Sequence, residues 1–404
     1  MRRREFIILF AGAAAMCSLR ATCALTGGFP HKESEVHANE LAASAESLVD
    51  QQIKSWMTKR NVPGLAACIV KGNKVVWCNG YGMANIGKKV PFTPDQSLFQ
   101  IASVSKTITA TAIMQLHDKG LLKLDEDVNK FLKFSVRNPN YPDRRITFRH
   151  LLTHTSSIRD SDVIYSLCAA GDPTVSLEEV VTQYFTLNGP LWNRKNYAKD
   201  APGTNKRYSN AGFSLLGYLV EVIGEQSFEE YLQQNIFGPL KMNETSLYIV
   251  KLNHEKHARA YTYVEKASRN LSPGDGDGNL LPEGVSPRIG YNEHILYSCP
   301  TLADSMVRTS VNQLSNFMIA IMNGGRFEKT QVLKEETVNE MLTQELGWFK
   351  TGDYWGHDGS DPGCSTEVML NPKTKVAVII FTNADVRLNW VKALLLAKAE
   401  EKTP

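Results

Sequence analysis

A hydroxyl and an amine stand three residues apart in the stretch Ser103-Val104-Ser105-Lys106, at the start of a run with helical character that continues to about His117. Residues three apart share one face of an α-helix, so the Ser103 hydroxyl and the Lys106 amine are predicted to lie within reach of each other. A serine becomes a strong nucleophile when a neighbouring base takes its proton, and a lysine with a lowered pKa can be that base. The free N–H groups of a helix start would also stabilise an oxyanion beside Ser103.

A lone Ser-x-x-Lys match is weak evidence, because both residue types are common and most such pairs lie on a solvated helix surface. The context therefore has to come from the rest of the chain. Its 404 residues are 43% hydrophobic and 22% charged, which is ordinary globular composition. We expect one large domain or two interleaved ones.

The N-terminus predicts a targeting segment. Three arginines at 2–4 precede an apolar run from Phe6 to Met16, and small residues follow at 21–24. We interpret residues 1–26 as a signal peptide and 27–44 as a linker, and expect export to the periplasm or the cell exterior. Arg3-Arg4 resembles a twin-arginine signal, and a mitochondrial presequence is the alternative. The apolar run is shorter than the roughly 20 residues that span a bilayer, so no stable membrane span is expected.

Charge excludes some partners. Residues 1–26 hold four arginines and one glutamate, which accounts for the whole formal net charge of +3. The chain without this segment is close to neutral, so nothing in it favours nucleic acid or an acidic membrane surface as a partner.

Five cysteines follow the predicted signal peptide, and an odd number cannot all pair: Cys68, Cys78, Cys168, Cys299 and Cys364. Cys68 and Cys78 flank a hairpin signal at Gly72-Asn73, but a two-residue turn would place Cys68 opposite Trp77. Buried free thiols are therefore favoured over a disulfide framework. No Cys/His spacing is typical of a metal site, and no metal or cofactor is expected.

The apolar pattern predicts strands near both ends of the chain and helices between them. Helices are expected at about 42–60, 103–117, 176–187, 212–238, 309–323 and 387–401. Strands are expected at about 65–71, 74–81, 346–349, 366–370 and 376–382. The two ends should build one sheet, with the middle forming a helical lobe. Residues 267–292 are interpreted as a flexible loop, because Asp275–Asn279 begins like a calcium loop but Leu280 and Ser286 occupy the positions of its glycine and glutamate.

Two further motifs follow the first in order: Tyr208-Ser209-Asn210, between predicted helices, and His357-Asp358-Gly359, in a predicted strand. Together the three motifs resemble those of the penicillin-recognising serine hydrolases, in the branch of class C β-lactamases, DD-carboxypeptidases, esterases and D-aminopeptidases. Two supporting stretches, 151–156 and 308–314, are also similar to this branch. The resemblance covers about residues 45 to 395.

The resemblance implies a mixed α/β (α+β) fold of the β-lactamase/transpeptidase type, with an antiparallel sheet built from both chain ends and a mostly helical lobe. The domain would span 45–401. Its sheet lobe would be about 45–100 and 295–401, and its helical lobe about 101–294.

The resemblance also implies the chemistry. Ser103 would attack a carbonyl and become acylated, and Lys106 and Tyr208 would share the proton transfers. A tyrosine can do so only if its pKa falls well below about 10, which an adjacent lysine cation would favour.

Substrate binding would involve the remaining motif residues. Asn210 would orient the lysine and hold the substrate amide or ester. The backbone N–H groups of Ser103 and of Ser360, the residue after Gly359, would form the oxyanion hole. His357 stands where many relatives have a lysine that binds a substrate carboxylate, and a histidine with a pKa of about 6.5 holds that group more weakly.

Three other positions are notable. Ser157 and Cys364 occupy positions where glycine and an aromatic are more usual in this branch. His154 is interpreted as structural and not as catalytic.

We therefore expect an exported serine hydrolase that cleaves an ester or amide through a Ser103 acyl-enzyme, in a DD-carboxypeptidase-like or esterase-like form. A β-lactamase, or a low-activity binding or assembly protein of the same fold, is the alternative. The expected partner is a small-molecule or peptide acyl substrate, and the oligomeric state is left open.

Overall fold

The computed structural model describes residues 48–265, 280–281 and 288–401. The predicted signal peptide and linker, the start of the predicted helix at 42–60 and the Asp275–Asn279 stretch lie outside these residues. The part from Gln51 onward forms one compact unit. None of the helices in the described ranges is long and apolar enough to cross a membrane.

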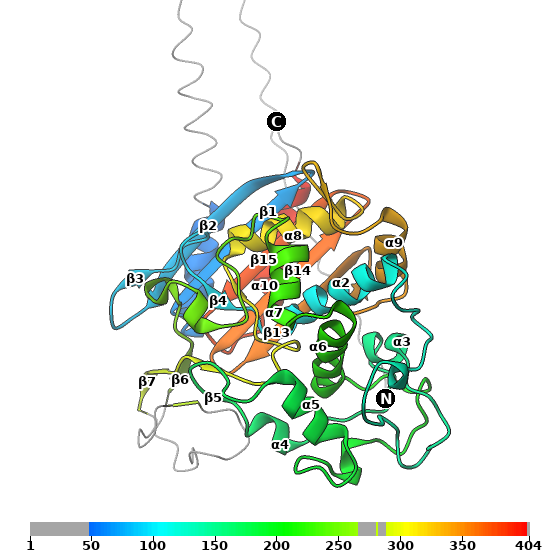
Figure 1. The fold of residues 1–404 in the computed structure, drawn as a ribbon. Coiled ribbons are helices and arrows are strands. Elements are labelled where there is room, and N and C mark those ends of the chain that lie inside the picture. The colour runs from blue at the N-terminus through cyan, green and yellow to red at the C-terminus, as the bar shows by residue number, and fades with distance from the viewer. Residues whose placement is uncertain (1–47, 266–279, 282–287, 402–404) are drawn as a thin grey trace, which may run out of the picture. The chain divides into compact units, whose positions relative to one another are not determined.

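A seven-stranded antiparallel sheet joins the two ends of the chain, as predicted (Figure 1). Its order is β12-β13-β14-β15-β1-β2-β3. The early strands are β1 (Gly64–Lys71), β2 (Lys74–Asn85) and β3 (Val90–Pro91). The late strands are β12 (Phe349–Thr351), β13 (Tyr354–Asp361), β14 (Cys364–Asn371) and β15 (Val376–Thr382). β1 pairs with β15 from Leu65↔Thr382 to Lys71↔Val376.

The central strands are apolar along their whole length because both faces of the sheet are covered. Residues 64–70 and 376–382 are all buried, the pattern expected of a strand with no solvated face. Two helices pack on β1 and β15: α8 (Val311–Met322) and α10 (Asn389–Glu400). Residues 51–60 are also helical, and Trp56 stacks on Trp390 of α10.

The middle of the chain is mostly helix and loop. Its helices are α2 (Ser105–Asp118), α3 (Phe148–Leu152), α4 (Asp162–Tyr165), α5 (Leu177–Phe185), α6 (Asn210–Gly224) and α7 (Phe228–Leu232), and α9 (Glu335–Thr343) follows later. Every residue of α2 from Ser105 to Leu116 is buried. Because α2 begins at the end of the Ser-x-x-Lys stretch, this burial fixes the stretch in the protein interior.

Short strand pairs complete the fold. They are β4 (Phe99–Gln100) with β9 (Arg308–Thr309), β5 (Ala169–Ala170) with β8 (Tyr297–Ser298), β6 (Tyr261–Val264) with β7 (Gly290–Glu293), and β10 (Arg326–Phe327) with β11 (Thr330–Gln331).

Two predicted helices have different limits in the structure. The helix predicted at 212–238 ends at Gly224, because Glu225 adopts a left-handed conformation with φ 53° and Ser227 and Glu230 form the capping box of α7. The helix predicted from Ser103 begins instead with a 3₁₀ turn, Ala102–Val104, and becomes α-helical at Ser105.

The prediction of free thiols is wrong for four of the five cysteines. Cys68 bonds Cys78, and Cys168 bonds Cys299. A bulge in β2 makes the first pair possible: the register shifts between Ile69 and Val70, so that Ile69 faces Trp77 and Cys68 faces Cys78. The extra residue of a bulge is invisible to a register counted from the turn. Cys364 is free and buried.

Candidate active site

The Ser103 turn is held against strand β13. A Cβ placed on Gly359 of β13 would lie 2.5 Å from the Ile101 oxygen and 3.0 Å from the Ala102 Cβ, so only glycine fits there. The Thr366 hydroxyl of β14 donates to the same Ile101 oxygen at 2.8 Å. Ala102 itself has φ 45°, a left-handed conformation that costs energy for a residue with a Cβ. The turn that presents Ser103 is therefore fixed by contacts from the last strands of the chain.

Lys106 contacts three oxygens. Its Nζ lies 3.1 Å from Ser103 Oγ, 2.6 Å from Asn210 Oδ1 and 2.9 Å from the Asp304 carbonyl oxygen. The amide and carbonyl oxygens only accept hydrogen bonds, so two of the lysine N–H groups are committed to them. The third position faces Ser103. There an ammonium would donate to Oγ, whereas a neutral amine would accept the serine proton.

Burial favours the neutral form. Lys106 is completely buried, and desolvation lowers its pKa from the ordinary 10.5, although the charges of Asp304, Asp160 and Asp361 oppose the shift. A buried lysine with a lowered pKa can hold a lone pair on Nζ near neutral pH.

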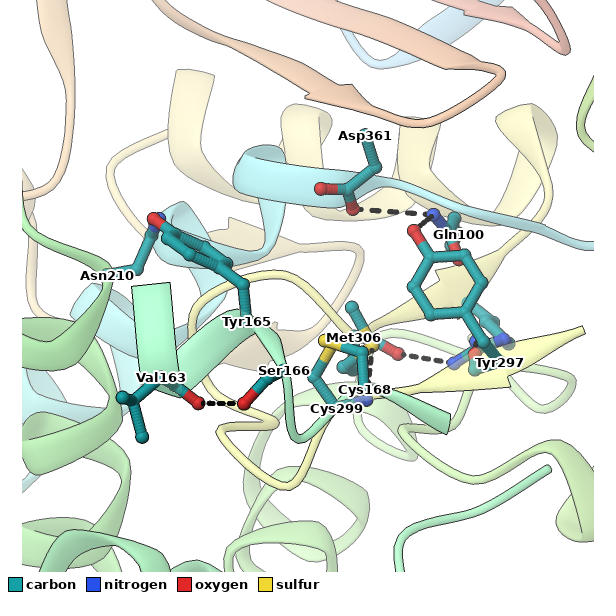
Figure 2. Close-up of a disulfide and its surroundings, with 11 residues drawn as sticks. Gln100, Val163, Tyr165, Ser166, Cys168, Asn210, Tyr297, Cys299, Met306 and Asp361 are labelled. Atoms are coloured by element: carbon teal, nitrogen blue, oxygen red, sulfur yellow. Dashed lines mark hydrogen bonds between the residues drawn. A yellow bond between two sulfur atoms is a disulfide. The ribbon is translucent and has the colours of Figure 1, made fainter. Parts of the chain in front are cut away.

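A chain of hydrogen bonds orients Asn210. Its Nδ2 donates to the Tyr165 hydroxyl at 2.7 Å, and that hydroxyl donates to Asp160 at 3.1 Å. Because Nδ2 is used in this way, Oδ1 must face Lys106. Figure 2 shows Tyr165 and Asn210 side by side. Every N–H or O–H along the path from Lys106 points toward the Asp160 carboxylate, and donors aligned in this way reinforce one another.

The Asp160 side chain also caps the N-terminus of helix α6. Its carboxylate accepts hydrogen bonds from the backbone N–H groups of Asn210 and Ala211, both at 2.9 Å, and from the Ser209 hydroxyl at 3.1 Å. A carboxylate at a helix N-terminus satisfies free N–H groups and interacts favourably with the dipole. Asp160 and Tyr165 were not predicted from the sequence, because no spacing links them to a motif about fifty residues later.

His154 holds the backbone on both sides of Tyr208. Its carbonyl oxygen accepts from Arg207 N at 2.6 Å, and its Nδ1 accepts from Ser209 N at 3.2 Å. Its ring also stacks on Tyr208 with centroids 4.4 Å apart. These contacts fit the structural role predicted for His154.

Tyr208 lies beside both residues of the first motif. Its hydroxyl interacts with the Ser103 side chain, and Lys106 Nζ lies 4.8 Å from the centre of its ring. The expectation of a lowered Tyr208 pKa is wrong. Desolvation of its hydroxyl in the site raises this pKa above 10.0, although 44% of the residue is exposed, and the charges of Asp304, Asp358 and Asp160 raise it further. Tyr208 is therefore a neutral phenol that can donate a proton.

His357 is buried and neutral at pH 7. Burial and the nearby Lys106 lower its pKa to about 4. Its Nδ1 lies 2.6 Å from the Asp358 carbonyl oxygen, so the proton of the neutral ring is on Nδ1 and Nε2 is unprotonated. The ring therefore supplies no positive charge to a substrate carboxylate.

The second half of β13 has an open edge. β12 pairs only with residues 354–356, so the strand from His357 to Asp361 continues beyond its neighbour. A strand edge of this kind can pair with an extended ligand. Gly359 and Ser360 lie in this segment, opposite Thr366 and Ser365 of β14.

A cavity of about 550 Å³ opens beside Ser103, a volume typical of small-molecule sites. Ser103 and Asn210, from the first two motifs, line it together with Ser360, the residue that follows the third motif. Tyr165 and both cysteines of the Cys168–Cys299 disulfide also line it (Figure 2). A second cavity, of about 520 Å³, lies along β13 and β14 and includes His357 but not Ser103. Within the described ranges, no cluster of three His, Cys, Asp or Glu side chains could hold a metal ion.

Ser157 occupies a position where glycine is more usual, and the structure shows how serine is accommodated there. It has φ 63°, a conformation that glycine adopts without strain. Its hydroxyl accepts from Asn138 Nδ2 at 2.9 Å, and its carbonyl accepts from Ala198 N at 2.8 Å, so the loop keeps its shape with serine. Cys364 is not among the residues that line either cavity. Its thiol donates to the Gln100 carbonyl oxygen at 3.4 Å.

The fold and these motifs are those of the penicillin-recognising serine hydrolase family. The chain belongs to the Beta-lactamase family, whose model matches residues 49–399. It is 27% identical to Protein flp of Staphylococcus aureus (strain N315) over 352 residues, which is 85% of this chain and 64% of that protein. It is 25% identical to Penicillin-binding protein 4* of Bacillus subtilis (strain 168), over 81% of this chain and 69% of that protein. The chain thus spans about two-thirds of the length of these relatives.

Solved structures show the same fold. The octameric penicillin-binding protein homologue from Pyrococcus abyssi aligns with a TM-score of 0.69 at 24% identity, over 87% of this chain and 77% of that one. The D-amino acid amidase from Ochrobactrum anthropi SV3 aligns with a TM-score of 0.68 at 20% identity, over 87% of this chain and 98% of that one.

Proposed function

We propose that this chain is a serine hydrolase that cleaves an amide or ester through an acyl-enzyme on Ser103, in a DD-carboxypeptidase-like or esterase-like form. The observation that carries the proposal is the set of three oxygens around Lys106 Nζ. Two of them can only accept, and the third is Ser103 Oγ at 3.1 Å. This arrangement directs the lone pair of a neutral lysine at the serine hydroxyl.

The reaction would proceed in two halves. Ser103 Oγ attacks the carbonyl carbon while its proton passes to Lys106 Nζ, and the N–H groups of Ser103 and Ser360 hold the oxyanion. Collapse breaks the bond to the leaving group, which receives the Tyr208 proton as Lys106 returns its proton to the phenol. Water then attacks the ester, with the same groups moving protons in the opposite sense. Asn210 holds the lysine and the substrate carbonyl group.

The neutral His357 supports the choice among substrates. Without a cation at this position, the site lacks a strong anchor for the carboxylate of a β-lactam, so hydrolysis of such antibiotics is the weaker alternative. A low-turnover binding or assembly protein of the same fold is a second alternative. We also propose export, which is supported by two disulfides of the kind that persist in oxidising compartments.

Labelling with a fluorophosphonate, followed by mass spectrometry, tests the proposal. We expect one adduct on Ser103 and none in Ser103→Ala. Ser105→Ala is the matched control, because its hydroxyl accepts from Val307 N at 3.2 Å and should not react. A wild-type protein that takes no label, or takes it on another residue, would contradict the acyl-enzyme.

Comparing acyl donors then distinguishes a peptidase, a β-lactamase and an esterase. A penicillin adduct that persists favours a peptidase, and one that turns over favours a β-lactamase. Turnover of p-nitrophenyl esters without a penicillin adduct favours an esterase.

The pH dependence of labelling should report the lysine. Deprotonated Lys106 is the active base, so the labelling rate should rise with pH through the lowered lysine pKa and level off below 10.5. The measurement is the second-order rate constant between pH 5 and 10, with circular dichroism to confirm that the protein stays folded. A rate that is still rising at pH 10 without levelling off would show that the Lys106 pKa is not lowered and would contradict this role.

A further inference from the structure

The Cys168–Cys299 disulfide joins two segments at the cavity beside Ser103. The two cysteines are 131 residues apart in the sequence, and both line the cavity. Figure 2 shows the bridge between the loop that carries Tyr165 and the end of β8. What the bridge holds in place depends on how firmly each segment is fixed without it.

The first segment, residues 161–171, is weakly held by its own contacts. Of these residues, Ile164 alone is buried, and strand β5 within the segment pairs with β8 over two residues. A segment that buries little apolar surface opens at a small cost in free energy. The covalent bond to Cys168 therefore has a large share in holding this segment.

The second segment, residues 297–310, is firmly fixed. Every residue in it is buried. The Ala303 carbonyl oxygen accepts from the Thr109 hydroxyl of α2 at 2.6 Å, and the Asp304 carbonyl oxygen accepts from Lys106 Nζ at 2.9 Å. The disulfide therefore ties a loosely held segment to one that is part of the protein interior.

Tyr165 lies one turn of backbone away from the bridge. The Cys168 N–H donates to the Tyr165 carbonyl oxygen at 3.2 Å, which closes that turn. The Tyr165 hydroxyl accepts from Asn210 Nδ2 at 2.7 Å, and Asn210 Oδ1 in turn accepts from Lys106 Nζ. A shift of Cys168 would therefore reach the lysine through one turn and one side-chain contact.

We propose that this disulfide positions Tyr165, and through it Asn210, for the acylation of Ser103, so that reducing the disulfide slows the reaction. The inference rests on the proposed function and adds a redox dependence to it. Reduction by a dithiol breaks the S–S bond and gives two cysteine thiols, while the dithiol loses two electrons and two protons and closes to its own disulfide. The site is then faster in an oxidising compartment than in a reducing one.

Fluorophosphonate labelling with and without dithiothreitol tests this inference. In the wild type, reduction should lower the labelling rate of Ser103 about three- to tenfold, the factor expected for the loss of one positioning hydrogen bond. Reoxidation should restore the rate. Alkylation of the free thiols in a parallel sample, followed by mass spectrometry, identifies which disulfide has been reduced.

Removing each disulfide in turn provides the matched control. Cys168→Ala/Cys299→Ala should label at the lower rate whether or not dithiothreitol is present. Cys68→Ala/Cys78→Ala loses the bridge between β1 and β2 but keeps the one at the cavity. It should label at the wild-type rate and should slow on reduction as the wild type does.

Tyr165→Phe separates positioning from a purely structural role. The change removes the hydroxyl that accepts from Asn210 and keeps the ring. Two changes that act through the same contact are not additive. Dithiothreitol should therefore slow Tyr165→Phe by a smaller factor than it slows the wild type. An equal factor in the two proteins would overturn the route through Tyr165.

A labelling rate that stays unchanged when alkylation shows Cys168 and Cys299 to be reduced would overturn the inference and leave the acyl-enzyme intact. If the bridge resists reduction in the folded protein, the two double variants decide. If Cys168→Ala/Cys299→Ala does not fold by circular dichroism, reduction of the wild type decides. A wild-type protein that takes no label would overturn the proposed function, and the inference with it.

Discussion

Replacing Lys106 by methionine is expected to lower the rate of Ser103 acylation by a fluorophosphonate by about 10²–10⁴-fold, the usual contribution of a positioned general base. Methionine is similar in length and suits a fully buried position, so the fold should survive the change. The substitution removes the only described amine within hydrogen-bonding distance of Ser103 Oγ. The measurement is the second-order labelling rate at pH 7, followed by mass spectrometry.

Lys123→Met is the control for this variant, because Lys123 is exposed on the loop after α2. Its labelling rate should match that of the wild type. Urea unfolding should show that Lys106→Met is folded under the assay conditions. A folded Lys106→Met protein that labels within threefold of the wild-type rate would assign the base to another group.

Replacing Asp160 by alanine is expected to lower the free energy of unfolding by about 3 kcal/mol, because the N-terminus of α6 loses its cap and several donors lose their acceptor. Asp160 accepts from two backbone N–H groups, from the Ser209 hydroxyl and from the Tyr165 hydroxyl. Urea denaturation measures the change. Asp143→Ala, at an exposed loop position, should change the stability by less than about 0.5 kcal/mol.

A second readout separates positioning from simple stability. Asp160→Asn keeps one acceptor oxygen but loses the charge at the end of the chain that orients Asn210. We expect it to remain folded and to label more slowly than the wild type, because Asn210 Oδ1 no longer holds Lys106 firmly. The rise in rate should move to lower pH, because the Asp160 charge that raises the Lys106 pKa is gone. An unchanged pH profile in a folded Asp160→Asn protein would limit Asp160 to capping the helix.

Local signals in the sequence predicted most of the sheet and the three motifs, although the strand expected at 346–349 begins only at Phe349. Apolar runs at both ends of the chain predicted the strands that pair as β1 and β15, and the contexts of Ser103, Tyr208 and His357 agreed with the structure. The pairing of Cys68 with Cys78 was missed, because it depends on one bulged residue that no turn rule reveals.

Other features depend on contacts between distant residues. The direction of the Tyr208 pKa shift was wrong, because it is set by burial and by carboxylates that the fold brings near from other segments. Asp160 and Asp304 have no sequence signal of their own: each becomes relevant only when the loop that carries it meets α6 or Lys106.

The pairing of β1 with β15 has a consequence for biosynthesis. About three hundred residues separate the two strands, so a ribosome must release almost the entire polypeptide before β1 finds its partner. The glycine that receives the Ser103 turn also emerges late, in β13. A nascent chain therefore carries Ser103 long before the strands that surround it in the folded protein have been made. A chain that stops before β13 would expose an unpaired apolar strand, which makes it a target for chaperones and proteases.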